Sequence, residues 1–131
     1  MRARSNLTAV EWEVMEAIWT LGDSPSVRQV LDHAYPNGEK AYTTVQTIMN
    51  TLERKGFLRR KKTGLVNFYR PTRSRRELAR SETSRLVSRV FDGSVPALAS
   101  HLIESGDLSL DEVEEIKKLV DRKAKDLRKN L

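Results

Sequence analysis

Cysteine is absent from the 131 residues of this sequence, so neither a disulfide nor a thiolate metal site can contribute to the fold. Aromatic residues make up 6% of the chain and apolar residues 38%, which limits the core to a modest size. No apolar run approaches the roughly 18 residues of a membrane span, and Met1 to Leu7 lack the apolar core of a signal peptide. These absences predict a soluble, unexported, cytoplasmic protein with no direct membrane insertion.

Enzyme chemistry is poorly represented as well. The two histidines, His33 and His101, are separated by a predicted domain boundary, and the sequence contains neither a nucleophile elbow nor a phosphate-binding loop. Two histidines without further ligands are too few for a zinc or copper site. The sequence therefore predicts no catalytic residues, no metal site and no cofactor.

Charge is present in excess and is unevenly distributed. The formal net charge is +6, and residues 1–76 hold 14 of the 24 Lys and Arg but only 7 of the 18 acids, a balance of +7. The remainder holds 10 basic and 11 acidic residues, a balance of −1. This split indicates that the N-terminal part meets a polyanion while the C-terminal part has another role.

Three helices are predicted in the N-terminal part. The first, residues 8–21, begins with the Thr-x-x-Glu spacing of a capping box and has apolar residues at helical intervals. A helix-start pair, Ser24 and Pro25, precedes the stretch SVRQVLDHA, which predicts a short second helix, and a third covers roughly residues 43–55 before a glycine. Trp12 and Trp19 share a side of the first helix, where we expect them to pack rather than to bind a ligand.

The third helix has an unusual outer face. Its apolar positions recur as in a core helix, but the other side carries hydroxyl and amide groups where a solvated helix would use Glu and Lys. Amide side chains can pair with base edges, and threonine methyl groups can contact the thymine methyl. The polar side comprises Thr43, Thr44, Gln46, Thr47, Asn50, Thr51 and Arg54.

The segment FLRRKKTGLVNFYRP, residues 57–71, predicts two short strands joined near Thr63 and Gly64. Two helices, a third helix with a polar face and a basic hairpin follow one another as in a winged helix-turn-helix. In that architecture the third helix enters the DNA major groove while the hairpin lies along the DNA backbone. The predicted DNA-binding residues are Thr43, Thr44, Gln46, Thr47, Asn50, Arg54, Arg59, Arg60, Lys61 and Lys62.

The C-terminal part predicts helices over residues 74–91, 95–104 and 109–129. The last carries an apolar stripe with too little second core to pack on, which favours dimerisation and a two-fold repeated operator. We therefore expect a mainly α protein with a small β-hairpin wing: a winged-helix DNA-binding domain, 1–73, and a helical dimerisation domain, 74–131. The predicted dimerisation residues are Leu98, Leu102, Val113, Ile116, Val120 and Leu127.

Two other functions use the same fold class. A winged-helix module for protein–protein contact predicts an apolar outer face on the third helix and needs no cationic wing, the reverse of what the sequence shows. An RNA-binding regulator is consistent with the charge, but single-strand readers display aromatic stacking platforms, and only Tyr42, Phe68 and Tyr69 lie near the basic segment. Competition between duplex DNA and RNA separates these alternatives.

The segments LTAVEWEVMEAIW, VRQVLDHA and AYTTVQTIMNTLERKGFLRR, followed by a tyrosine-containing wing and a helical tail with DEVEEIKKLVD, resemble the BlaI/MecI penicillinase-repressor family. The copper-responsive CopY repressors are relatives of that family. The resemblance covers nearly the whole chain and is most specific over residues 41–60. It implies a dimeric repressor on a palindromic operator, with an N-terminal winged helix and a C-terminal dimerisation domain.

The resemblance also implies a mode of release. In penicillinase repressors, a membrane-embedded sensor protease that detects β-lactam brings about cleavage of the dimerisation domain at an Asn-Phe pair. His101 and Leu102 occupy that place here, so the pair differs from the family's. The C-terminal cysteine pairs with which CopY-like relatives bind metal are absent, so release by metal is not expected. The implied partners are operator DNA, a second copy of the chain, and a sensor protease or another protease.

Overall fold

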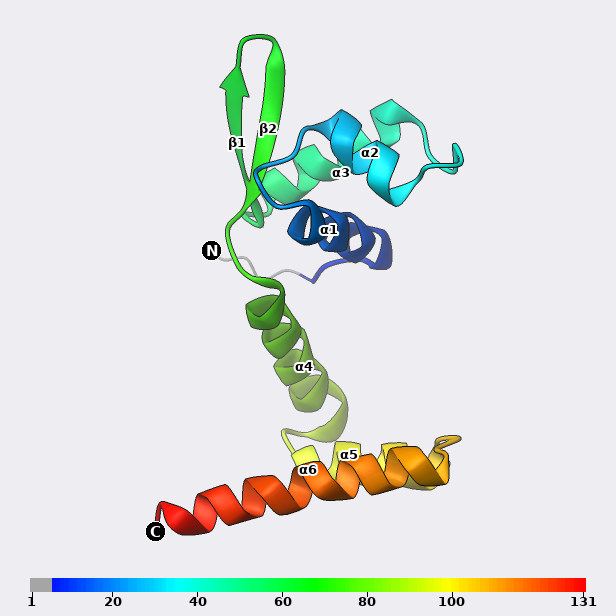
Figure 1. Cartoon of the computed structure of the whole chain (residues 1–131), viewed down its shortest axis with the longest axis vertical. Coiled ribbons are helices and arrows are strands. Elements are labelled where there is room, and N and C mark those ends of the chain that lie inside the picture. The colour runs from blue at the N-terminus through cyan, green and yellow to red at the C-terminus, as the bar shows by residue number, and fades with distance from the viewer. Residues whose placement is uncertain (1–5) are drawn as a thin grey trace. The chain divides into compact units, whose positions relative to one another are not determined.

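The structure, a computed structural model, describes residues 6–131. Residues 1–5, which belong to the predicted N-terminal domain and to the segment predicted to lack a signal peptide, lie outside the described part. The described chain divides into two compact units: residues up to Thr83, the winged-helix unit, and residues 84–131, the C-terminal unit. The elements in chain order are α1 (Ala9–Leu21), α2 (Val27–Ala34), α3 (Tyr42–Arg54), β1 (Leu58–Thr63), β2 (Val66–Pro71), α4 (Arg75–Phe91), α5 (Val95–Ser105) and α6 (Leu110–Lys129) (Figure 1). This order confirms the predicted fold class.

Local hydrogen bonds explain where the helices begin. At α1, the Glu11 N–H donates to Thr8 Oγ1 at 3.1 Å while the Thr8 N–H donates to Glu11 Oε1 at 2.9 Å, which is the predicted capping box. The same reciprocal bonds join Ser109 and Glu112 at α6. The start of α2 differs from the prediction, because the cap is Ser26 rather than the Ser-Pro pair before it.

The three helices of the winged-helix unit enclose one core. Most of the predicted inner residues of α1, α2 and α3 are buried, whereas Val10, Leu21, Ala34 and Ile48 are only partly buried. The hairpin adds Leu58 and Tyr69 to the core. Trp12 and Trp19 pack edge to face, with ring centroids 5.5 Å apart, which confirms their structural role. The core residues with no exposed surface are Val14, Met15, Ile18, Val30, Val45, Met49 and Leu52.

The hairpin of β1 and β2 is antiparallel, with Arg59 opposite Arg70 and Lys61 opposite Phe68. Its two-residue turn contains Gly64 at φ 65°, a left-handed conformation that favours glycine. The base of the hairpin is tied to the loop before α2, since the Tyr69 N–H donates to the Pro25 carbonyl at 3.0 Å. Figure 1 shows the hairpin projecting from the helices beside α3.

The first turns of α4 belong to the winged-helix unit. Leu78 is 1% exposed and joins its core, and the Arg75 guanidinium donates two hydrogen bonds of 3.0 Å to the Glu16 carboxylate of α1. Trp19 Nε1 donates to the Arg73 carbonyl at 3.0 Å. A fragment meant to retain this fold therefore has to continue beyond Ser74 to residue 83.

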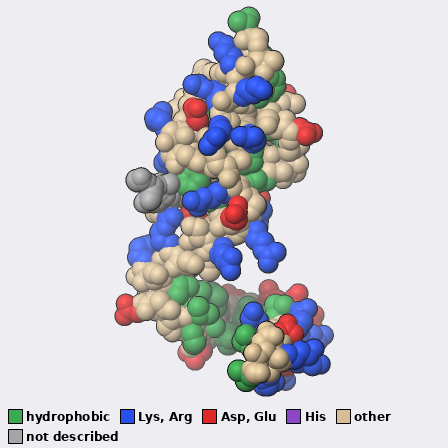
Figure 2. Space-filling view, turned by 90° about the vertical axis from the view of Figure 1, so that its left-hand side faces the viewer, with side chains coloured by type: hydrophobic (Ala, Val, Ile, Leu, Met, Phe, Trp, Pro, Cys, Tyr) green, Lys and Arg blue, Asp and Glu red, His purple; other side chains and the backbone are tan. Residues whose placement is uncertain are grey.

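The C-terminal unit contains little packing of its own. Neither α5 nor α6 has a buried residue, although both carry large apolar side chains. Figure 2 shows hydrophobic side chains, green, on the surface of this unit. Within residues 6–131, no helix is long and apolar enough to cross a membrane. The exposed apolar residues of these two helices include Val95, Leu102, Ile103, Leu110, Val113, Ile116, Leu119, Val120 and Leu127.

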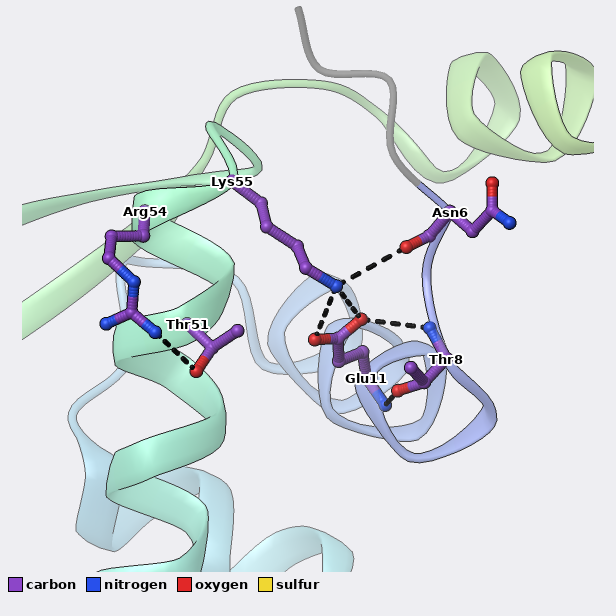
Figure 3. A network of polar contacts seen from close by, with 6 residues as sticks. All are labelled: Asn6, Thr8, Glu11, Thr51, Arg54 and Lys55. Atoms are coloured by element: carbon purple, nitrogen blue, oxygen red, sulfur yellow. Dashed lines mark hydrogen bonds and ion pairs between the residues drawn. The ribbon is translucent and has the colours of Figure 1, made fainter.

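A buried ion pair joins the C-terminal end of α3 to the first turn of α1. Lys55 Nζ lies 2.8 and 2.9 Å from the two carboxylate oxygens of Glu11, which is 5% exposed (Figure 3). Burial alone raises the pKa of Glu11, but hydrogen bonds from Lys55 and from the Thr8 N–H outweigh it, and the pKa lies below its ordinary value of 4.5. The ionised carboxylate therefore stabilises the position of α3.

We predict that Lys55→Met lowers the free energy of unfolding at pH 7 by about 2 to 4 kcal/mol, because it leaves a buried carboxylate without its cation. Because the folded pKa of Glu11 is lowered, its contribution is present above pH 4.5 and is lost as the pH falls below that value. Urea unfolding should therefore show a smaller difference between the two proteins at pH 3 than at pH 7.

Arg54→Met provides the matched control one residue away. The Arg54 side chain is exposed and donates to Thr51 Oγ1 at 3.2 Å (Figure 3). Its replacement should change stability by less than about 0.5 kcal/mol. Equal losses for both variants would contradict the role assigned to the ion pair.

Candidate nucleic-acid interface

The outer face of α3 is open to solvent, because Val45, Met49 and Leu52 turn the opposite face into the core. The backbone remains satisfied despite the threonines, since Thr47 Oγ1 donates to the Thr43 carbonyl at 2.9 Å. Of the predicted reading residues, Thr43, Thr44, Thr47 and Arg54 are exposed, whereas Gln46 and Asn50 are half-buried on the side nearest the hairpin. All six lie on the one helix, four of them exposed and two partly covered, and their contact with DNA stays a prediction.

The start of α3 lies beside Arg28, a residue that the sequence did not single out. Its N-cap, Ala41, makes no side-chain hydrogen bond, so the first N–H groups of the helix keep their capacity to donate. Close by, the Arg28 guanidinium lies 5.1 Å from the centre of the Tyr42 ring. The sequence gives little indication of this contact, because an arginine on a short amphipathic helix is usually an ordinary solvent-exposed residue.

The predicted wing cations lie on two faces of the hairpin. The strand register alternates side chains, so Arg60 and Lys62 share a face with Tyr69, while Arg59 and Lys61 share the other face. Arg70 lies opposite Arg59 and adds a cation that the sequence reasoning missed. Figure 2 shows Lys and Arg side chains, blue, gathered on the side of the winged-helix unit that carries the hairpin.

The face with Tyr69 is turned toward α3. The Tyr69 hydroxyl donates to Asn50 Oδ1 at 2.7 Å, and Arg60 Nε lies 3.8 Å from Glu53 Oε1. Burial raises the pKa of Tyr69 above its ordinary value, and the Arg60 cation opposes this shift without cancelling it. The hydroxyl therefore stays protonated and remains a hydrogen-bond donor at neutral pH.

Two open clefts flank these surfaces. One, of about 430 Å³, lies between α2, α3 and the tip of the hairpin, and Arg28, Tyr42, Gln46 and Asn67 line part of it. The other, of about 620 Å³, lies on the opposite face of the hairpin and is lined by Arg59, Lys61 and Arg70, among others. Among residues 6–131, no group of three or more His, Asp or Glu side chains is placed to hold a metal ion. Polar donors and cations thus dominate the region around α3 and the wing.

Comparison with known proteins identifies the kind of molecule that uses this arrangement. A family model described as penicillinase repressor matches residues 7–122. The chain belongs to the penicillinase repressor family. This chain is therefore a DNA-binding transcriptional repressor and not an enzyme.

Individual relatives of this repressor extend over almost the same length. It is 26% identical over 117 residues to the methicillin resistance regulatory protein MecI of Staphylococcus aureus, covering 89% of this chain and 94% of that protein. It is 23% identical over 121 residues to the penicillinase repressor of Bacillus licheniformis, covering 92% and 94%. An uncharacterized 16.5 kDa protein of Latilactobacillus sakei is 28% identical over 120 residues, covering 92% and 82%. The predicted family is confirmed.

We predict that Lys61→Ala weakens binding to operator and to random duplex DNA alike. Within residues 6–131, no acidic side chain forms an ion pair with Lys61, so its charge is available to a phosphate. Loss of one phosphate contact should reduce the slope of log K against log salt concentration by roughly one unit. Fluorescence anisotropy at several salt concentrations measures the slope.

Lys118→Ala in α6 is the charge-matched control, since it removes one cation from the other unit. It should leave the salt slope unchanged. A slope for Lys61→Ala that equals the wild-type value would exclude a phosphate contact at this position.

Proposed function

We propose that this repressor recognises a specific duplex operator with α3 in the major groove and the hairpin on the neighbouring backbone. The observation that carries the proposal is the exposed hydroxyl and amide side of α3 beside a hairpin rich in cations. Gln46 and Asn50 supply amides for base edges, while the threonines and Arg54 supply contacts to bases or phosphates. Arg59, Arg60, Lys61 and Lys62 contribute affinity that does not depend on sequence.

The apolar stripe of α6 supports assembly as a homodimer. The α6 helix has 20 residues and no buried residue. Two apolar residues of its stripe are open to solvent, since Ile116 is 37% exposed and Val120 60% exposed. An amphipathic helix without tertiary packing is marginal in water, so a second copy is the natural cover for its stripe and for Leu98 and Leu102 of α5. A two-fold dimer presents two reading helices, and the operator is then a palindrome.

Release of the operator follows, in this proposal, from loss of the dimer. The candidate cleavage pair, His101 and Leu102, lies within α5, where the Leu102 carbonyl accepts from the Gly106 N–H at 3.1 Å and Ser105 Oγ donates to the His101 carbonyl. A helix has to open locally before a protease can take it as an extended strand, and α5 has no buried residue to oppose opening. A membrane sensor protease or another protease would then cut the chain in the cytoplasm, where operator DNA is found.

The double variant Ile116→Asp with Val120→Asp tests the dimer. Two carboxylates in the middle of the stripe would be buried without partners, so we expect a monomer by sedimentation. Loss of the second reading helix should weaken operator binding by about 10²- to 10⁴-fold. Wild-type protein that remains monomeric at high micromolar concentration would contradict the proposal.

The control places the same residue type on the opposite side of the same helix, as Lys118→Asp with Arg122→Asp. This variant changes the net charge more than the test variant does, yet it should remain dimeric. If both variants dissociate, charge rather than burial of the stripe governs assembly.

Removal of the C-terminal unit tests whether dimerisation controls occupancy. A fragment ending at Thr83 retains Leu78 and the pair of Arg75 with Glu16, so it should fold and bind a half-site weakly. It should fail to occupy the full operator at concentrations that saturate the intact chain, in gel shifts at matched salt. Binding within about threefold of the intact protein would show that control lies elsewhere.

A further inference from the structure

A hydrogen-bonded chain crosses from the wing to α3. Tyr69 is 1% exposed, and its hydroxyl donates to Asn50 Oδ1 at 2.7 Å. Arg60 is the cross-strand neighbour of Tyr69, and its Nε lies 3.8 Å from Glu53 Oε1. Asn50 and Glu53 are three residues apart on α3 and so share one side of the helix.

The direction of the protons in this chain is fixed by its members. A guanidinium has only N–H donors, so Arg60 beside Tyr69 cannot accept the tyrosine proton. The tyrosine proton is directed to the carbonyl oxygen of Asn50. Exchange of the two ends of the amide would leave that proton without this acceptor, so the observed orientation is favoured.

The orientation of the amide turns its N–H₂ group toward a ligand. Asn50 Oδ1 is engaged by Tyr69, and no described residue accepts a hydrogen bond from Asn50 Nδ2. Asn50 is half-buried and lies one and two helical turns from Thr47 and Thr43, both of which are exposed. The free Nδ2 group thus belongs to the same surface as the exposed threonines.

We propose that Tyr69 is a positioning residue that makes Asn50 meet a base edge through its N–H₂ group, and so favours a base with acceptors, guanine N7 and O6 above all. This inference rests on the proposed function and adds the base class that one residue reads. Free asparagine instead suits adenine, because its carbonyl accepts from adenine N6 while its N–H₂ donates to N7. The Tyr69 hydroxyl already occupies one lone pair of this carbonyl and turns it toward the hairpin, which disfavours the two-point contact with adenine.

The test is selection of binding sites from random duplex DNA with four intact proteins: wild type, Asn50→Ala, Tyr69→Phe and Asn50→Asp. The base pair read by Asn50 is the one at which Asn50→Ala loses discrimination, by about tenfold. At that pair the wild type should select guanine. Tyr69→Phe keeps the buried ring and frees the carbonyl, so selection should move to adenine at this pair and remain unchanged elsewhere.

Asn50→Asp provides a second arm that does not depend on the folding of Tyr69→Phe. The carboxylate can still accept from Tyr69, and its second oxygen puts an acceptor where the N–H₂ group was, so selection at the pair should move from guanine toward cytosine, whose N4 amino group is a donor. Retained selection of guanine would overturn the inference, because the N–H₂ group would then not make the contact.

The remaining outcomes separate the inference from the function on which it rests. Three outcomes each overturn only the role assigned to the Asn50 N–H₂ group. The wild type selects adenine at this pair, or Asn50→Ala changes discrimination at no pair, or Tyr69→Phe gives the same profile as the wild type. If the wild type selects no duplex sequence, sequence-specific recognition itself fails and the inference falls with it. Thermal unfolding of each variant verifies that the fold is retained.

Discussion

The buried Tyr69 side chain holds together the parts of the winged-helix unit that must keep a fixed geometry to read DNA. The backbone N–H of Tyr69 donates to the Pro25 carbonyl before α2, and its side-chain hydroxyl donates to Asn50 Oδ1 on α3. A two-stranded hairpin is at best marginally stable on its own in water, so the hairpin depends on this attachment for its direction. The reading helix and the wing consequently behave as one surface.

The pairing register of β1 and β2 determines on which face of the hairpin each cation lies. Arg60 is turned toward Glu53 and is partly neutralised, whereas Arg59 and Lys61 lie on the other face with Arg70. Phosphate contacts provide affinity at any sequence, while base contacts provide selectivity. In the arrangement we propose, the wing therefore has two functions: one face orients an amide that reads a base, and the other attracts the backbone.

Local patterns predicted most of the fold, because they arise from interactions within a few residues. Capping spacings placed the starts of α1 and α6, and apolar periodicity identified the inner face of α3. The contacts that shape the site join residues far apart in the chain, and no local pattern contains them. Asn50 and Tyr69 are 19 residues apart, and Glu11 and Lys55 are 44 apart. The residue types of the site were predictable, but their orientation was not.

The two units differ in what stabilises them, and this difference favours control by tethering. The winged-helix unit has its own core, which includes Leu78 at the start of α4, so its fold does not require the C-terminal unit. α5 and α6 have no buried residue and gain most from a partner. In a dimer, one bound winged helix raises the local concentration of the second at its half-site. Separation of the copies would then lower operator occupancy while every DNA-contacting side chain kept its native position.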